Sequence, residues 1–167
     1  SAGGRTRLED LGASQLCAWT LHAMKYFIGF ITALSVLVAI SLAAILAGAV
    51  NVAATDPHSA LTTWVMNTAM RRSVIARSFT IAPPTPFTEE QARHGFEEFD
   101  EMCVTCHGAP GKKRSATGKG LRPQPPNLAE AGPNWSDGNL FWIVKNGIKM
   151  TGMPAFGPTH DDGTLWR

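Results

Sequence analysis

The stretch CVTCH, residues 103–107, brings together side chains that can do chemistry. Two of the three cysteines in this 167-residue chain stand here, three positions apart, and a histidine follows the second directly. Cysteines at this spacing suit a disulfide, a redox dithiol, a zinc site or the attachment of a cofactor. The five residues alone do not decide among these four possibilities.

The sequence around CVTCH disfavours three of the four. A disulfide or redox dithiol across two intervening residues is typical of a βαβ setting, and no alternating strand pattern flanks this one. Structural zinc needs four ligands, usually as two pairs, and the chain has no second CxxC and no HxxxH. The third cysteine, Cys17, precedes a long apolar stretch, and we expect it to be a reduced thiol without a partner.

Covalent haem attachment is the chemistry that CVTCH favours. Each cysteine of a C-x-x-C-H turn adds to one vinyl group of the haem, and the histidine then lies under the ring and binds the iron. We therefore predict thioether bonds at Cys103 and Cys106 and an axial iron ligand at His107. The expected cofactor is a single haem c.

A second iron ligand is expected, because an open iron site invites oxygen chemistry. Methionine sulfur suits ferrous iron and raises its reduction potential, and KMTGMPAF offers Met150 and Met153. We favour Met153, because Gly152 permits a close approach to the haem and Pro154 fixes the following backbone. A bis-histidine haem is less favoured, and its candidates are His58, His94 and His160.

An apolar stretch near the N-terminus indicates on which side of a membrane this site lies. Residues 26–54 carry no charge and are long enough to cross a bilayer, so we predict a transmembrane helix there. Basic residues precede it in segment 1–25, and the first one after it is Arg71. The excess of basic residues predicts a cytoplasmic N-terminus and a haem domain outside, where c-type haem is attached.

The segment 55–83 follows the predicted span. Asp56 is a good N-cap and Pro57 suits a first helical position, so we predict a helix that leaves the membrane or lies on its outer surface. Prolines then make IAPPTPF, residues 81–87, a stiff linker. We place a domain boundary there, with a soluble domain over 84–167.

Capping residues outline the helices of this domain. Thr88 to Gln91 form a capping box for a helix that runs into CVTCH, and Ser136 begins a second helix, which ends at Gly147. Residues 108–134 are rich in Gly and Pro and predict a loop. Asp161 and Asp162 are suited to capping a last helix.

Three motifs make residues 84–167 resemble the class I cytochrome c family: CVTCHGAPG, GLRPQPPNL and NGIKMTGMPAFG. The resemblance implies an all-α domain in which the first helix crosses the last, with Gly95 and Phe99 at the contact. It also implies haem-pocket roles, in which the Pro110 carbonyl orients the proximal histidine. The remaining pocket residues that it implies are Pro126, Leu128 and Trp142. Class I domains close with a long helix, and we expect that C-terminal helix to be missing here, because only HDDGTLWR remains.

These features predict an electron carrier rather than an enzyme: a single-haem protein tethered to a bacterial inner membrane, with its haem domain in the periplasm. The expected partners are a redox donor and acceptor, and the net charge of +2 is too mild to indicate nucleic acid. Two alternatives stay open, a fixed subunit of a larger respiratory complex and, less favoured, a gas- or peroxide-reactive haem protein. A basic cluster after the motif steers an acidic partner or forms a solvated surface; its members are Lys112, Lys113, Arg114, Lys119 and Arg122.

Overall fold

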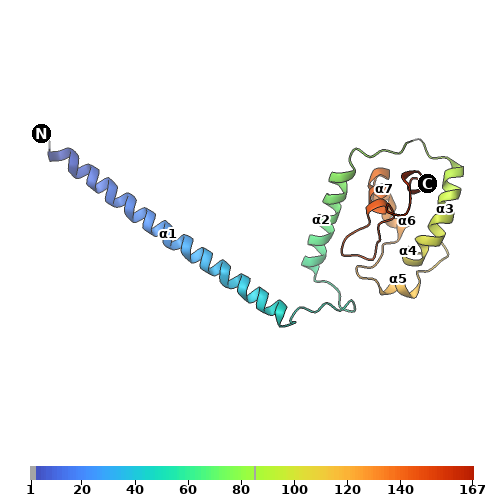
Figure 1. Cartoon of the computed structure of the whole chain (residues 1–167), viewed down its shortest axis with the longest axis horizontal. Coiled ribbons are helices and arrows are strands. Elements are labelled where there is room, and N and C mark those ends of the chain that lie inside the picture. The colour runs from blue at the N-terminus through green and yellow to red at the C-terminus, as the bar shows by residue number, and fades with distance from the viewer. Residues whose placement is uncertain (1–2, 85) are drawn as a thin grey trace. The chain divides into compact units, whose positions relative to one another are not determined.

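The protein is helical, as predicted. The structure is a computed structural model that describes residues 3–84 and 86–167, with side chains described at Trp19, 22–84 and 86–167. No strand occurs in these described residues, and the chain divides into two compact units, Ser1–Val52 and Ala53–Arg167 (Figure 1). The thiol of Cys17 lies outside the described side chains.

The first unit is built on one long helix, α1, Gly3–Leu46. Its portion His22–Leu46 is apolar and long enough to be a candidate membrane span, and Ser41 Oγ returns a hydrogen bond to the Leu37 carbonyl at 2.9 Å. The helix ends at Leu46, before the end of the charge-free stretch 26–54. Gly48 has φ +71°, and Ala49 N–H bonds the Ala44 carbonyl at 3.0 Å, which is the closure that stops a helix at a glycine.

The second unit opens with α2, Ala60–Ser78. We predicted Asp56 as its N-cap, but the structure places the cap at Ser59, whose Oγ accepts a hydrogen bond from the Thr62 amide at 3.1 Å. Residues 56 and 57 therefore precede the helix. The hydroxyl of Ser59 satisfies one of the amide groups that a helix start leaves free, and this fixes the start of α2.

The α2 helix packs against α7, Asp137–Asn146. Val74 and Ser78 of α2 are buried, and Asn139 Nδ2 of α7 donates to Ser78 Oγ at 2.5 Å. A Cβ on Gly138 would lie 2.1 Å from the Ile81 carbonyl oxygen, so only glycine allows this approach. The compact unit begins at Ala53, whereas we predicted a boundary at the proline-rich linker. The prolines predict a stiff linker, but they do not show that the helix before the linker packs against a helix after it.

The α3 helix, Glu89–Met102, leads to the CVTCH turn. Its predicted capping box is confirmed, since Gln91 N–H donates to Thr88 Oγ1 and the Gln91 side chain accepts from the Thr88 amide. A Cβ on Gly95 would lie 2.1 Å from the Arg167 carbonyl oxygen. Gly95 therefore lies at the contact between α3 and the C-terminal residues, as the resemblance implied.

The C-terminal residues also supply an aromatic contact. The short α8 helix, Asp162–Leu165, is capped by the Asp161 side chain, and the next residue, Trp166, stacks on Phe141 of α7 with ring centroids 4.2 Å apart. Phe141 is buried, as are Val74 and Val104. Within the described residues these three are the fully buried hydrophobic side chains, so the polypeptide alone provides a thin core for the second unit.

Residues 108–134 contain more structure than the loop that we predicted. They hold α5, Ala116–Gly120, α6, Leu128–Ala131, and the 3₁₀ helix η1, Gly132–Asn134. Ser115 Oγ accepts from the Gly118 amide, and Asn127 Oδ1 accepts from the Ala129 amide. Side-chain caps thus start helices that are too short for any apolar periodicity to predict.

Candidate haem site

The CVTCH motif forms one helical turn, α4, Val104–His107, directly after α3. The Cys103 carbonyl accepts from the His107 amide at 2.9 Å, and this closes the turn around both cysteines. The α5 helix lies against it, because Ser115 N–H donates to the Thr105 carbonyl at 3.0 Å. A Cβ on Gly118 would lie 2.7 Å from the same Thr105 oxygen, so this approach depends on glycine.

The two thiols of the motif are free and half-buried. Burial raises the pKa of the Cys103 thiol above its ordinary value, and the neighbouring Cys106 raises that pKa further. A redox dithiol or a thiolate metal site requires the opposite shift, because the reactive species is the anion. The environment of Cys103 therefore favours a neutral thiol.

His107 is oriented by a loop residue that is distant in sequence. Its Nδ1 lies 2.9 Å from the Pro126 carbonyl oxygen. A carbonyl oxygen only accepts hydrogen bonds, so Nδ1 carries the proton and donates it, and Nε2 keeps a free lone pair. We assigned this role to the Pro110 carbonyl; the structure instead leaves Pro110 exposed in the turn after the motif, with Pro126 beside the imidazole.

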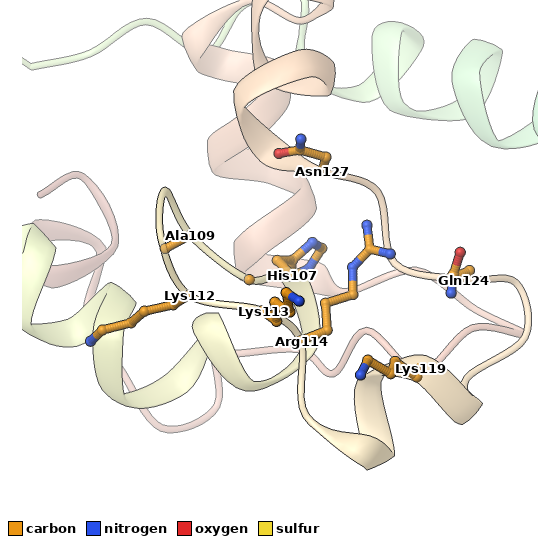
Figure 2. A pocket seen from close by; sticks show the side chains of 9 residues that line it. His107, Ala109, Lys112, Lys113, Arg114, Lys119, Gln124 and Asn127 are labelled. Atoms are coloured by element: carbon orange, nitrogen blue, oxygen red, sulfur yellow. The ribbon is translucent and has the colours of Figure 1, made fainter.

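A basic pocket of about 370 Å³ opens beside His107 (Figure 2). Arg114 reaches into it, and the Arg114 Nε is buried with no hydrogen-bond partner among the described residues. Lys112 also lines the pocket, and its ammonium pairs with Asp100. The full lining is His107, Gly108, Ala109, Lys112, Lys113, Arg114, Lys119, Gln124 and Asn127.

The loop that carries the second predicted ligand is held against the end of α7. Gly147 has φ +64°, and a Cβ there would lie 2.7 Å from the Met153 carbonyl oxygen. The Phe156 amide donates to the Val144 carbonyl at 3.1 Å, and the Gly157 amide donates to Lys145 at 2.9 Å. These two bonds follow Met153, and the Ile148 amide donates to the Met153 carbonyl itself at 3.3 Å, so backbone hydrogen bonds fix the course of this loop.

The two candidate methionines lie in different environments. Met150 is 80% exposed and has φ +60°, whereas Met153 is half-buried and its amide donates to Thr151 Oγ1 at 3.0 Å. A Cβ on Gly152 would lie 2.7 Å from the Leu121 side chain, so this loop also touches the loop that follows α5. The exposure of Met150 leaves Met153 as the better placed sulfur.

The remaining predicted residues are less closely tied to the site. Leu128 and Trp142 are half-buried at the start of α6 and within α7. His58 and His94 are exposed, and the ring of His160 lies 2.9 Å from the Thr159 hydroxyl. Arg114 lines the pocket beside His107, but from the sequence we predicted it only as a member of a basic surface cluster.

Residues 90–167 match the family described as "Cytochrome C oxidase, cbb3-type, subunit III". No curated protein and no solved structure matches the chain. The matched segment contains the CVTCH turn and the Met153 loop. The match supports a class I c-type cytochrome domain over these residues, and this class implies haem and the transport of electrons.

The site has the features that a haem needs. The donor set is a histidine with a free Nε2, a half-buried thioether and two free cysteines three positions apart. Arg114 Nε is a buried donor without an acceptor, which a carboxylate side group of haem would satisfy. The hydrophobic core of the second unit is thin, and the large apolar ring of a haem would complete its packing.

Proposed function

We propose that this protein is a membrane-tethered electron carrier with one covalently bound haem c. Cys103 and Cys106 would hold the haem through thioether bonds, and His107 and Met153 would bind its iron. The observation that carries the proposal is the 2.9 Å contact between His107 Nδ1 and the Pro126 carbonyl oxygen. A carbonyl that accepts from the other ring nitrogen of a histidine in this way fixes the imidazole tautomer and directs Nε2 to a metal.

The residues of the site would bind and shield rather than catalyse. When bound, haem supplies the exchange of one electron between ferrous and ferric iron. Arg114 would pair with a carboxylate of the haem, and the Gly147-to-Gly157 loop would hold Met153 against it. Leu121 would exclude water where the two loops touch. Leu128 and Trp142 stay as weaker haem-pocket candidates.

We propose that α1 anchors the domain in a bacterial inner membrane. Its portion His22–Leu46 has the required length and hydropathy. Because basic residues precede this portion and the next one follows only at Arg71, the N-terminus would be cytoplasmic and the haem domain periplasmic. The redox partners would then be periplasmic or membrane-bound proteins.

The basic residues near the pocket support an acidic docking partner. Lys113, Lys119 and Arg114 line one pocket beside His107 (Figure 2). Clustered charge of one sign steers an oppositely charged protein during encounter, and the effect weakens with ionic strength. Electron transfer to an acidic donor or acceptor is therefore expected to slow as salt is raised.

The test is whether haem stays attached under denaturing conditions. The full chain, produced in a host that matures c-type cytochromes, should retain haem on a denaturing gel. Cys103→Ser with Cys106→Ser should lose it completely, whereas Cys17→Ser, the matched control, should keep it. Absence of attached haem from the parent chain, with the host's own cytochromes matured, would overturn the proposal.

A second candidate is a fixed haem subunit of a larger respiratory complex. The printed description of the matched family, a subunit of an oxidase, favours it. Small residues within α1, which include Gly29, Ala33 and Ala43, permit close packing of helices in a bilayer. Stable copurification with other subunits in mild detergent would favour this candidate, and a lone monomer would favour the free carrier.

A further inference from the structure

The α2 helix exposes a row of large apolar side chains. Positions 61, 65, 68, 72, 75 and 79 recur at alternating steps of four and three residues, so they share one side of the helix, and Trp64 borders them three residues after Leu61. Trp64 is 65% exposed and Phe79 is 80% exposed. We define the α2 stripe as Leu61, Trp64, Val65, Arg72, Ile75 and Phe79.

Another side of α2 accounts for its packing within the domain. Val74 and Ser78 are buried against α7, and Arg71 lies over the Trp135 ring at 4.7 Å. Figure 1 shows α2 beside α7 at the edge of the second unit. Within the described part of the unit, the α2 stripe takes no part in this packing, and its exposure needs a separate explanation.

The charge around the stripe favours an anionic surface. Residues 57–88 contain three arginines and no aspartate or glutamate. Arg77 donates to the Ser73 hydroxyl at 2.8 Å, whereas Arg72 is exposed within the stripe itself. A long arginine side chain lays its stem on apolar groups and extends its charge to phosphates, and tryptophan favours the same interfacial depth.

Chain connectivity keeps this surface close to lipid. The helix that supplies the candidate span ends at Leu46, and α2 begins at Ala60. The residues between them reach at most about 45 Å when fully extended, at about 3.5 Å each. If α1 spans the membrane, a bilayer surface is always available to α2 at high effective concentration.

We propose that the α2 stripe docks on the anionic lipid surface of the membrane that α1 spans. Leu61, Trp64 and Phe79 would enter the headgroup boundary, and Arg72 would contact lipid phosphates. The proposal rests on the membrane anchor of the proposed function. The stripe, rather than the linker alone, would then hold the haem domain at the membrane surface.

The test measures lipid contact at single sites in the haem-loaded full chain. Nitroxide labels are placed at Val65→Cys, Asn67→Cys and Val38→Cys in a Cys17→Ser background, in nanodiscs that contain phosphatidylglycerol. Val65 belongs to the stripe, Asn67 is exposed on another side of α2, and Val38 belongs to the candidate span. The readout is collision with oxygen, which concentrates in lipid, against collision with a water-soluble nickel chelate.

If the stripe docks, the label at position 65 should collide with the nickel chelate severalfold less often than the label at 67. Its collisions with oxygen should be more frequent than those at 67. Arg72→Glu should weaken docking about tenfold, whereas Arg72→Lys should restore it. Nickel access at 65 equal to that at 67, with 38 in lipid, would overturn docking and leave the anchor intact. If the label at 38 also collides freely with the nickel chelate, both the docking proposal and the membrane anchor are overturned. Loss of both collisions at 65 would indicate coverage by protein and would also overturn the proposal.

Discussion

The histidine side and the methionine side of the site are built in different ways. His107 belongs to a regular helical turn, and one side-chain hydrogen bond to Pro126 sets its ring. Met153 belongs to an irregular loop, which backbone hydrogen bonds fasten to the last residues of α7. Glycines permit the close packing on both sides, Gly118 beside the turn and Gly147 beneath the loop.

This difference bears on how each ligand can be lost. His107 follows Cys106 directly and lies one turn from Cys103, so the proposed covalent attachment would hold it near the iron even when the surrounding loop moves. The methionine has no such bond, and its position depends on the backbone between Gly147 and Gly157. We therefore expect perturbations of the methionine loop to change the iron ligation first, with covalent attachment preserved.

The largest effect is expected from Met153→Leu, a change that nearly conserves volume. It should abolish the weak near-infrared band of methionine-ligated ferric haem. It should also lower the reduction potential by on the order of 0.1 V or more, within the roughly 0.8 V that axial ligands span. Potentiometric titration and absorption spectra measure both quantities. The exposed Met150→Leu is the control, and loss of the band there instead would assign the ligand to Met150.

Gly147→Ala should disturb the methionine side next most strongly. Alanine is strained at φ +64°, and its Cβ would lie 2.7 Å from backbone atoms of Met153 and Pro154. The combined strain should cost about 2–4 kcal/mol in the free energy of unfolding. Denaturant titration measures this cost, and the near-infrared band should weaken while haem stays attached. An unchanged band would show that the loop tolerates displacement.

Gly118→Ala is the corresponding change on the histidine side. Its Cβ would lie 2.7 Å from the Thr105 carbonyl oxygen and would push α5 away from the CVTCH turn. We expect a loss of about 1–3 kcal/mol in the free energy of unfolding, with the methionine band retained. Gly120→Ala, in the same helix and with nothing within 4 Å of its added Cβ, should have little effect. If both variants lose the methionine band, the two sides are coupled.

The smallest expected effect concerns how the free energy of unfolding falls at acid pH. Hydrogen bonding from the Thr164 amide lowers the pKa of the Asp161 carboxyl, so its carboxylate stabilises the folded state. This stabilisation is complete above the unfolded pKa of about 3.9 and disappears as pH falls through the lower folded value. Asp161→Asn should therefore reduce the slope of stability against pH in that acid range. An identical slope in thermal melts would contradict the role of Asp161 as a cap.

Local chemistry explains which elements were predictable. The capping box of Thr88 and Gln91, the helical turn of CVTCH and the end of α7 at Gly147 all depend on interactions within a few residues. Such interactions are encoded by neighbouring side chains, so spacing alone predicts them. The same holds for the helical class of the domain, which the matched family supports.

The contacts that were missed join residues far apart in the chain. The partner of His107 is Pro126 rather than Pro110, and the course of the intervening loop decided which carbonyl reached the imidazole. The packing of α2 on α7 crosses the proline-rich linker, and it became visible only through the buried Val74 and Ser78. Competition between caps, as at Ser59 and Asp56, was likewise not resolved by residue type.

The sequence by itself determined the features from which the chemistry is proposed: two cysteines and a histidine on one turn, a methionine loop, and an apolar helix before them. Covalent and short-range interactions impose these features, and they need no knowledge of the rest of the chain. Only the tertiary structure decided which carbonyl orients His107, that Arg114 is a buried donor beside it, and that α2 belongs to the same compact unit as the CVTCH turn. These contacts join segments that are distant in the sequence. They form only when the whole unit packs closely, so short-range interactions do not specify them.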